Sequence, residues 1–574
     1  MSSATRWMGA AAFVGLLGAA GYMLGLQEKP LPPAPLPMPA TGEVHDGPNV
    51  LIILWDTVRA DRLSLYGYEL PTTPNLDAFA KNARVYERAI SPGIWTPPSH
   101  GSMFTGLPPS QHGVRATYKW LDDHHETMAE VLKAHGYDTY AFSANPFVAQ
   151  TTNLLQGVDL VDHSFEGKWK RQARRATVSK LIDGDASTDI SPAWRPMQGQ
   201  KTSGTSHAYK DAGTVIDDAF FEWVEKRPDQ NRPFFAYLNY MEAHIPRVPS
   251  MAARKKVMDD TLIDVSLRTV VAQINLLSYT FGKHDFSDQE LEAINRTYDA
   301  ALIDLDAATG ELLDGLKSRG LLDNTVVILT SDHGENLGDH HMFGHKYSIW
   351  DTLLHVPLVI HHPGMVEAGR VDTPVSNLDI FGTVFDLVGL DKPEEAPLSA
   401  SLNNLPTRND VFSEMVEATP VAIQRVDKLY GVENQEQWLT TYRAIERNRR
   451  KLVLGSDGST RLYDLTADPK ELTPIAPMDP DEVASLTASL NHWHDSFPAY
   501  DPAARSSSDA PLDVGATEML EQLGYMVDDK DAEPEEAPPK KGGGRVMPKL
   551  KVPAGASAPK KRKGQRRRSN PNGQ

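Results

Sequence analysis

The 574-residue chain contains no cysteine. It therefore has no disulfide bond to stabilise it, and no cysteine side chain that could be converted into a catalytic group. Its stability must come from burial of apolar surface, and hydrophobic residues make up 40% of the sequence, which is enough for a large core. The absence of cysteine thus leaves oxygen and nitrogen side chains to carry any chemistry.

Apart from its C-terminal end, the chain as a whole carries an excess of negative charge. Residues 540–574 hold 12 Lys or Arg and no acidic residue, so the remaining chain carries a formal charge of −30 rather than the overall −18. Such an acidic body is a poor platform for nucleic acid, and we expect no nucleic-acid partner. Residues 501–574 have the composition of a disordered tail with a basic end, in which residues 519–523 are expected to dock as a short helix.

The chain has one long apolar run, from Trp7 to Leu26, which contains no charged residue. Its 20 residues are enough to cross a hydrocarbon layer of about 30 Å. We interpret residues 1–28 as an export signal or membrane anchor and residues 29–47 as a proline-rich linker. Since no clear small-x-small cleavage site follows, an uncleaved anchor is favoured over a removed signal. The catalytic part is expected outside the cytoplasm, either anchored or secreted to the periplasm or beyond.

Apolar runs of four to eight residues alternate with helical stretches from Val50 to about Leu390, a pattern typical of a mostly parallel sheet covered by helices. The predicted strands are Val50–Trp55, Thr139–Ser143, Phe234–Asn239, Thr325–Thr330 and Pro357–Ile360. The spacing over 288–319 predicts a long amphipathic core helix. The polar segment 167–207 interrupts the pattern, either as a solvated loop or as a cationic lip for an anionic substrate.

A second region follows the proline- and acid-rich stretch 392–397. It is expected to contain several strands, at Val421–Arg425, Thr440–Glu446, Lys451–Leu454 and Arg461–Leu465.

Four of the predicted strands in the first region run into a polar residue: Asp56, Asn145, His244 and Asp332. In open α/β sheets the ligand crevice lies beyond the carboxyl ends of the strands, so these side chains are expected to converge on one rim.

Thr96 supplies a hydroxyl group beside two prolines. Pro97 and Pro98 suit the start of a helix, predicted over 99–105 and closed by Gly106, and the free amides of a helix start favour a developing oxyanion. Together with Asp56, Asp332 and His333, the threonine oxygen could ligate one divalent metal that activates the hydroxyl. The alternatives are that Thr96 merely caps the helix and that the acids satisfy loop amides.

Several short segments occur in a characteristic order, and together they resemble the sulfatase and alkaline-phosphatase superfamily from about Asn49 to about Ala476. They are Pro74-Asn75-Leu76-Asp77, Trp95 to Gly106, Gln111-His112-Gly113-Val114, Ser331-Asp332-His333-Gly334-Glu335, Gly344-His345-Lys346 and Val356-Pro357-Leu358. The resemblance implies a catalytic domain over 48–390, with a large mostly parallel sheet sandwiched by helices. It also implies a small C-terminal antiparallel α+β subdomain over 398–500.

The sequence departs from conventional sulfatases at several positions of the site. Thr96 stands where they have a cysteine or serine that is oxidised to formylglycine, and His100 stands for an arginine. Thr57 replaces a second aspartate and His333 replaces an asparagine. Losing a carboxylate and gaining an imidazole shifts the expected metal from Ca²⁺, which is still compatible, toward Zn²⁺ or Mn²⁺. A second metal is left open, with His340 or His341 as ligands.

The resemblance also implies roles for other residues. His244 matches a histidine that protonates the leaving oxygen, and Lys346 matches a lysine that neutralises the bound anion. Where sulfatases carry a Gly-Lys-Trp-His stretch, this chain has Asn145-Pro146-Phe147, so a lysine and a histidine are missing. The expected substrate-binding residues are His100, Asn145, His345 and His340. His112 is interpreted as structural, bracing the turn before Gly113.

These features predict a metal-dependent hydrolase of anionic esters with a Thr96 nucleophile. A phosphate monoester, a phosphodiester or a phosphoryl headgroup is favoured, on a small molecule, a glycan or a lipid. One alternative is a sulfuric ester hydrolase that dispenses with formylglycine. Another is an inactive domain that binds anionic glycans. The sequence leaves the natural substrate and the oligomeric state open.

Overall fold

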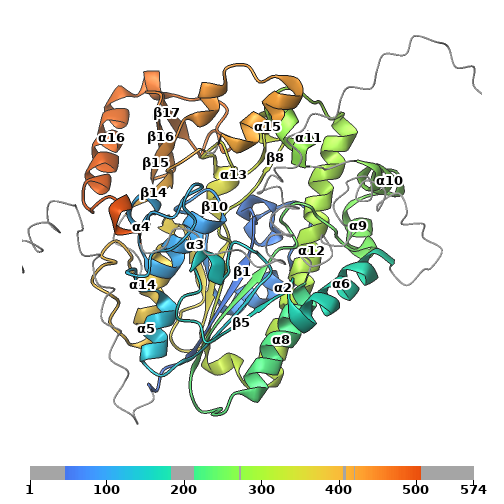
Figure 1. Cartoon of the computed structure of the whole chain (residues 1–574), viewed down its shortest axis with the longest axis vertical. Coiled ribbons are helices and arrows are strands. Elements are labelled where there is room, and N and C mark those ends of the chain that lie inside the picture. Colours follow the sequence, from blue (N-terminus) through green and yellow to red (C-terminus); the bar gives the residue numbers. More distant parts are fainter. Residues whose placement is uncertain (1–44, 183–211, 270–272, 405–408, 419, 506–574) are drawn as a thin grey trace, which may run out of the picture. The chain divides into compact units, whose positions relative to one another are not determined.

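The computed structural model describes residues 45–182, 212–269, 273–404, 409–418 and 420–505 (Figure 1). The predicted anchor, most of the linker, residues 183–207 of the polar segment, and all but the first residues of the basic tail lie outside this range, as does the helix expected at 519–523. No helix in the described ranges is long and apolar enough to cross a membrane. The anchor therefore stays a prediction.

The main sheet has eight strands in the order β12-β2-β11-β7-β1-β6-β4-β5. Only β11 runs antiparallel to its two neighbours, which confirms a mostly parallel sheet. All five predicted strands belong to it. The strands are β1 (Asn49–Trp55), β2 (Arg84–Tyr86), β4 (Asp138–Ser143), β5 (Leu160–His163), β6 (Phe234–Tyr240), β7 (Thr325–Thr330), β11 (Leu358–His361) and β12 (Gly369–Val371).

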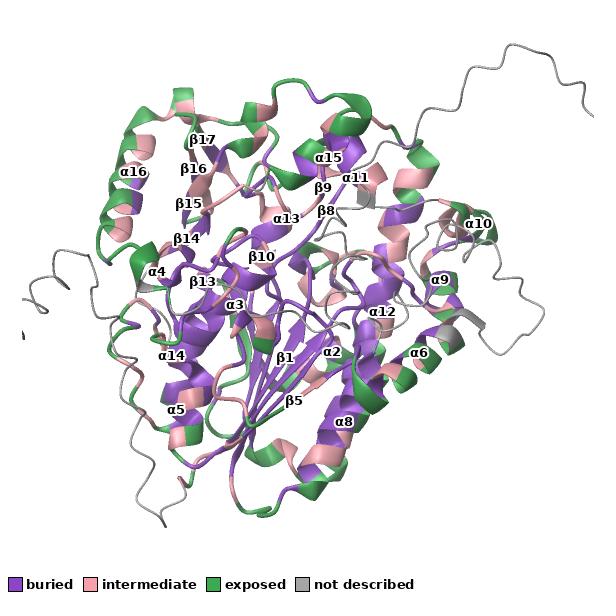
Figure 2. Ribbon diagram, in the orientation of Figure 1, coloured by how far each residue is buried: buried purple, intermediate pink, exposed green. Residues whose placement is uncertain are grey.

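Helices bury both faces of this sheet, which explains why its central strands are continuous apolar runs. Alternate residues of β1 belong to two different core clusters: Leu51 and Ile53 pack on one face, and Val50 and Ile52 on the other. The first face is covered by α2 (Pro74–Phe79), α8 (Gly213–Lys226) and α12 (Asp288–Ser318), and the second by α3 (Thr96–Thr105), α5 (Met128–Ala134) and α14 (Asp379–Val388). Figure 2 shows the central strands of this sheet as buried.

The long helix predicted over 288–319 is confirmed as α12. It begins with a capping box, in which the Ser287 side chain accepts from the Glu290 amide and Glu290 binds back to the Ser287 amide. The predicted nucleophile helix is also present, but α3 begins three residues earlier than expected, at Thr96 itself.

A separate four-stranded antiparallel sheet, in the order β14-β15-β16-β17, confirms the predicted C-terminal architecture. Its strands are β14 (Asp410–Met415), β15 (Tyr442–Arg447), β16 (Arg450–Gly455) and β17 (Thr460–Asp464), and α16 (Pro480–His494) packs on one face through Leu486 and Leu490. All described residues fall in one compact unit, so the domain boundaries at 390 and 398 stay predictions.

Two local expectations are wrong. Residues 421–425, predicted as a strand, begin α15 (Val421–Tyr430), because Ala422, Ile423 and Val426 form one buried helical face against α11 (Gln273–Thr280) and outweigh the β-branched composition. The solvated loop expected at 167–207 is instead α6 (Gly167–Ile182) as far as it is described, with Trp169 and Ala173 buried against α8.

The remaining elements are short and connect these layers. They are α4 (Pro109–His112), α9 (Met251–Val257), α10 (Asp260–Arg268), α13 (Asp351–Leu354), β3 (Ala89–Ile90), β8 (Asn336–Leu337), β9 (Phe343–Gly344), β10 (His355–Val356) and β13 (Val375–Ser376).

Candidate active site

Four neighbouring strands deliver the predicted polar residues to one edge of the main sheet. In sheet order β7, β1, β6 and β4 are followed by Asp332, Asp56, His244 and Asn145, and all four residues are buried. The Asn145 amide Nδ2 donates to Asp56 Oδ2 at 2.7 Å. Parallel strands place their carboxyl ends together, so the expected convergence is confirmed.

Helix α3 brings Thr96 to the same edge. All ten of its residues are buried, and its first turn contains Pro97 and Pro98. The Thr96 hydroxyl oxygen lies 3.3 Å from His333 Nε2 and 3.4 Å from Asn145 Nδ2. The N-cap position of α3 is Trp95, so Thr96 lies inside the helix and does not cap it. Its hydroxyl instead contacts residues at the strand ends.

A histidine beneath α3 has the structural role expected of it. His112 Nδ1 accepts from the Val114 amide at 3.1 Å, and its Nε2 lies 3.1 Å from the Pro98 carbonyl oxygen. Burial lowers the pKa of His112 to about 3, so the ring stays neutral. A Cβ atom at Gly101 would lie 2.7 Å from this ring, which explains a glycine inside a helix at that point.

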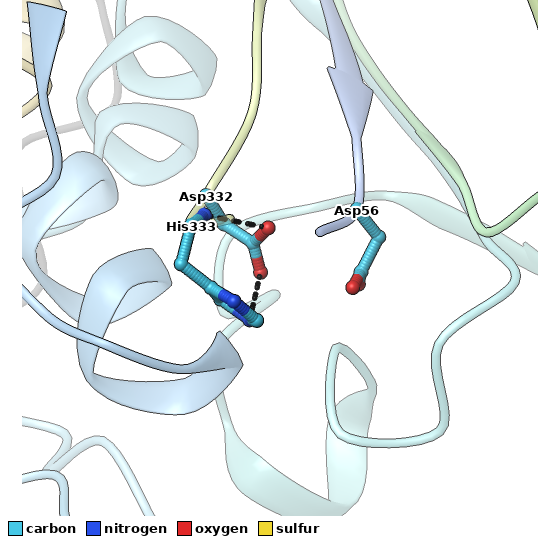
Figure 3. A group of neighbouring side chains, drawn as sticks. All are labelled: Asp56, Asp332 and His333. Carbon is cyan, nitrogen blue, oxygen red and sulfur yellow. Dashed lines mark hydrogen bonds and ion pairs between the residues drawn. The ribbon is translucent and has the colours of Figure 1, made fainter. Parts of the chain in front are cut away.

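Asp56, Asp332 and His333 form the group best suited to a metal ion. One ligand atom from each lies within 4.8 Å of the others, and Figure 3 shows the three side chains extending into the same region from the ends of β1 and β7. Asp332 Oδ1 accepts from the amides of Thr57 and His333, whereas its buried Oδ2 accepts no hydrogen bond within the described structure. The donor set and this buried carboxylate oxygen without a hydrogen bond fit a divalent cation.

Electrostatics at these residues agree with that fit. Burial, and then the charge of Asp56, raise the pKa of Asp332 well above its ordinary value. Burial and the neighbouring His345 lower the pKa of His333 well below its ordinary value, so its ring is neutral, the form that binds metals. His333 Nδ1 donates to the Gly334 carbonyl at 2.8 Å, which directs Nε2 toward Thr96 and Asp332.

Thr57 is the residue that the resemblance matches to a second aspartate, and its hydroxyl is engaged by the backbone. Its hydroxyl donates to the Asp56 carbonyl at 2.7 Å. Its backbone has φ +61°, a strained conformation for threonine, and it is held there by Tyr298, whose hydroxyl donates to the Thr57 carbonyl at 2.8 Å. This conformation points the Thr57 amide at Asp332 Oδ1.

Both ring nitrogens of His100 are engaged within the fold. Nδ1 donates to the Thr96 carbonyl at 2.8 Å, and Nε2 accepts from the Tyr237 hydroxyl at 2.6 Å. Burial lowers its pKa to about 4. His100 thus positions α3 against β6, and its expected contact with substrate stays a prediction.

His345 lies beside two of the other histidines of the site. Its ring centroid is 4.5 Å from that of His333 and 5.4 Å from that of His244. Its Nδ1 is paired with Glu335 Oε1 at 3.0 Å, and Arg247 donates to the second Glu335 oxygen, also at 3.0 Å. His244 Nδ1 donates to the Ile245 carbonyl at 2.6 Å, which fixes the orientation of its ring.

The other predicted residues lie farther along the same segment. Lys346 is half-buried, and its pKa is lowered to about 8 by burial and then by Arg425 and Lys119. The His340 ring stacks on Trp350 at 4.2 Å, and that of His341 contacts Tyr279 at 4.0 Å. Roles for His340 and His341 at a second metal or at the substrate stay predictions.

Sequence reasoning missed several residues that support this site. Glu335 ends the segment Ser331-Asp332-His333-Gly334-Glu335, which carries the family resemblance, so the sequence could have pointed to it. Arg247 and Tyr237 had no such signal, because each acts on a partner that is far away in sequence.

Comparison with known proteins identifies the family. The family model described as Sulfatase matches residues 48–390. The chain belongs to the sulfatase family. A second model, described as N-sulphoglucosamine sulphohydrolase, C-terminal, matches residues 338–493. This sulfatase-family protein is therefore a hydrolase of ester bonds in the superfamily that includes alkaline phosphatase, and it belongs to a metal-dependent family.

Curated relatives match most of the chain at low identity. Arylsulfatase K of Bos taurus is 26% identical over 471 residues, covering 78% of this chain and 81% of the relative. Choline-sulfatase of Rhizobium meliloti (strain 1021) is 27% identical over 485 residues, covering 80% of this chain and 89% of the relative.

Among solved structures, the phosphonate monoester hydrolase of Agrobacterium radiobacter has a TM-score of 0.59 at 23% identity, covering 78% of this chain and 95% of its own. A protein solved in complex with its substrate D-glucosamine-2-N,6-O-disulfate has the same TM-score at 18% identity, covering 80% and 99%. These likenesses support the fold.

Proposed function

We propose that this protein hydrolyses anionic esters with Thr96 as nucleophile, and that phosphoesters are its favoured substrates. The observation that carries the proposal is the place of the Thr96 hydroxyl, 3.3 Å from His333 Nε2 and 3.4 Å from Asn145 Nδ2 at the edge where Asp56 and Asp332 also lie. A hydroxyl in such surroundings is positioned to attack an ester bound at the same edge.

Asp56, Asp332, His333 and the Thr96 oxygen would hold the metal. A divalent cation bound there would lower the pKa of the hydroxyl and neutralise charge on the ester. One imidazole and two carboxylates favour Zn²⁺ or Mn²⁺, with Ca²⁺ still compatible. The free amides at the start of α3 favour negative charge beside Thr96.

Other side chains would serve the ester itself. Asn145 Nδ2 donates between Asp56 and the Thr96 oxygen, and so orients the nucleophile. The Lys346 ammonium would neutralise the bound anion. His244, with Nδ1 committed to a carbonyl, would present Nε2 to the leaving oxygen. His100, His345 and His340 would complete the substrate surroundings.

The choice of phosphoester rests on what Thr96 can do. A secondary hydroxyl can attack phosphorus directly, whereas a conventional sulfatase needs an aldehyde made from cysteine or serine. The lysine and histidine that conventional sulfatases supply after β4 are also absent, since Asn145-Pro146-Phe147 stands there. Sulfate ester hydrolysis without formylglycine is the second candidate, because the curated relatives named above are sulfatases.

Export of the catalytic part, with the N-terminal run as signal or anchor, belongs to the same proposal. It is supported by the uncharged apolar run of 20 residues near the N-terminus. The substrate would then be met outside the cytoplasm, on a small molecule, a glycan or a lipid.

Matched aryl phosphate, aryl phosphodiester and aryl sulfate esters test the proposal on the full chain, together with elemental analysis of the purified protein. We expect about one divalent metal per chain and the highest kcat/KM on a phosphoester. Replacing Thr96→Ala should lower kcat/KM by about a thousandfold or more, because a covalent nucleophile is removed.

Thr96→Ser is the matched control, since it keeps a hydroxyl and should keep much of the activity. Faster turnover of the sulfate would establish the second candidate instead. A preparation without stoichiometric metal, in which turnover stays at the uncatalysed background both before and after Thr96→Ala, would show that the domain only binds anions.

A further inference from the structure

One hydrogen bond connects the central strand β6 to the helix that carries Thr96. The Tyr237 hydroxyl, on β6, lies 2.6 Å from Nε2 of His100, on the second turn of α3. Tyr237 is in register with Ile52 of β1 and Ala141 of β4, so the sheet fixes its backbone on both sides. The Tyr237 and His100 side chains are both completely buried. A rigid strand therefore holds the ring of a residue on the nucleophile helix.

The direction of this hydrogen bond follows from the other partners of the two side chains. The Thr96 carbonyl oxygen can only accept, so Nδ1 of the neutral His100 ring, 2.8 Å away, carries the ring proton and Nε2 is the acceptor. Burial raises the pKa of Tyr237 well above its ordinary value, so its hydroxyl keeps the proton that Nε2 accepts. Tyr237 and Thr96 thus hold one ring nitrogen each, and the ring cannot turn over without losing both bonds.

Aromatic packing also restricts the His100 ring. It meets the Tyr237 ring edge to face at a centroid distance of 5.9 Å and the Phe104 ring at 5.6 Å. Phe104 and Tyr237 meet in the same way at 5.1 Å. Edge-to-face contacts have a preferred geometry, so they add to the hydrogen bonds in fixing the orientation of the imidazole.

The N–H group of this fixed ring faces the residues proposed to bind a metal. Nδ1 of His100 lies 3.6 Å from Asp332 Oδ2, the buried oxygen that accepts no hydrogen bond within the described structure, and 2.8 Å from the Thr96 carbonyl oxygen. One N–H group is therefore next to both a proposed carboxylate ligand and the backbone of the proposed nucleophile. The hydrogen bond from Tyr237 determines where that N–H group lies.

We infer that Tyr237 is a positioning residue for the metal-binding group, and that it acts through His100 to hold Thr96 in place relative to Asp332. The inference rests on the proposed function for the roles of Thr96 and Asp332. Tyr237 itself needs no contact with the substrate, because its hydroxyl is engaged by His100 and its ring is buried between β6 and α3.

Tyr237→Phe tests the inference, because it removes the hydroxyl and keeps the packed ring. Mn²⁺, Zn²⁺ and Ca²⁺ are each titrated calorimetrically into the chelated full chain, and kcat and KM are measured on the best aryl ester. We expect the cation that the unchanged protein binds most tightly to bind about tenfold more weakly, as is usual when a residue that orients a metal ligand is lost. We also expect kcat to fall about tenfold, with a smaller change in KM, because the nucleophile is misplaced.

Tyr86→Phe is the matched control. Tyr86, on β2, is a buried tyrosine that packs on the same face of the sheet, and its hydroxyl donates to the Leu402 carbonyl at 2.9 Å. Loss of this hydroxyl should lower stability, and it should leave cation affinity and kcat unchanged. A purely structural role of Tyr237 predicts the same result for Tyr237→Phe.

His100→Leu shows whether Tyr237 acts through His100. Adding Tyr237→Phe to His100→Leu should lower neither cation affinity nor kcat any further, because the intermediate is already lost. The comparison of Tyr237→Phe with Tyr86→Phe decides the inference even if His100→Leu does not fold. The inference is overturned if Tyr237→Phe leaves affinity and kcat unchanged, if Tyr86→Phe lowers them as much, or if the effects of Tyr237→Phe and His100→Leu add.

These measurements separate the two proposals. A cation affinity that depends on Tyr237, in a protein that turns over no ester, would support the positioning role and defeat the proposed function. Turnover that requires Thr96 and is indifferent to Tyr237 would defeat the positioning role alone. Absence of both cation binding and turnover would defeat both.

Discussion

Two buried groups of charged residues in this protein differ in whether they include basic side chains. At the strand ends, Asp332 has His333 at 3.3 Å and His100 at 3.6 Å, and within the described structure it forms no ion pair with an arginine or lysine. Between the main sheet and the C-terminal sheet, Arg88 and Lys451 bind three carboxylates. Their ion pairs are Arg88–Asp351 at 2.5 Å, Arg88–Glu446 at 2.6 Å, Lys451–Asp351 at 2.9 Å and Lys451–Glu471 at 2.7 Å.

The two groups shift the pKa of their aspartates in opposite directions. In the ion-pair network, Arg88 and Lys451 lower the pKa of Asp351 despite its burial. At the strand ends, burial and Asp56 raise the pKa of Asp332. The network therefore contains its own counter-charges and holds two sheets together, whereas the strand-end group favours an added cation. Burial alone does not separate a structural charge cluster from a functional one; the presence of counter-charges does.

The largest expected effect comes from Asp332→Asn. Metal should be lost and kcat/KM should fall by about a thousandfold or more, because a charged ligand of the cation is removed. Stability after chelation should stay the same or rise, because Asp332 no longer repels Asp56. Elemental analysis, ester kinetics and thermal unfolding of the chelated proteins measure these effects. A clear loss of stability in chelated Asp332→Asn would contradict the conclusion that the strand-end group, unlike the ion-pair network, does not stabilise the fold without a metal.

Glu446→Gln should lower the stability of the fold and leave metal binding and turnover intact. Arg88 Nε donates to Glu446 at 2.8 Å and its second nitrogen pairs with the same carboxylate at 2.6 Å, so the variant leaves a buried guanidinium with only Asp351. We expect a loss of about 3 kcal/mol in urea unfolding, with metal content and turnover of the folded protein kept.

The double variant Arg88→Met with Glu446→Gln is its control, and it should be less destabilised than the sum of the two single changes. Additive losses would mean that the pair is not a unit and that the network does not hold the sheets together.

The smallest effect is expected at Glu471, the surplus carboxylate of the network. Burial raises its pKa from an ordinary 4.5 to about 7, with Lys451 opposing and Asp351 adding to the shift. The folded state thus binds the proton more tightly than the unfolded state, so stability is highest below about pH 4.5 and falls as the pH rises to about 7. Glu471→Gln should remove this fall and raise stability by about 1 kcal/mol above pH 7.

Unfolding measured across that pH range tests the assignment. Glu414→Gln is a useful comparison, because Glu414 is another buried acid whose pKa burial raises, but it binds Ser110 rather than the network. An unchanged pH profile in Glu471→Gln would show that this carboxylate stays charged in the fold.

The sequence was most informative where local pattern and tertiary environment agree. Strands β1 and β7 are buried on both faces, which requires unbroken apolar runs, and their ends are marked by Asp56 and Asp332. Residues 421–425 were misassigned because β-branched residues suit a strand, while a buried helical face formed with α11 decided the outcome.

Pairings across long sequence separations could not be predicted. Arg88 and Glu446 are 358 residues apart, and His100 meets Tyr237 across 137 residues. Nothing in the neighbourhood of either residue in the sequence specifies its partner, since such contacts depend on how layers of the fold stack.

The amino-acid sequence by itself determined the α/β architecture, the order of polar residues after the strands, and the place of Thr96 at the start of a proline-containing helix. These follow from local hydrophobic period and from the rule that parallel strands end together. Only the tertiary structure decided which charges are neutralised and which histidines hold the scaffold. Those properties depend on distances between segments that the chain brings together only when its layers pack.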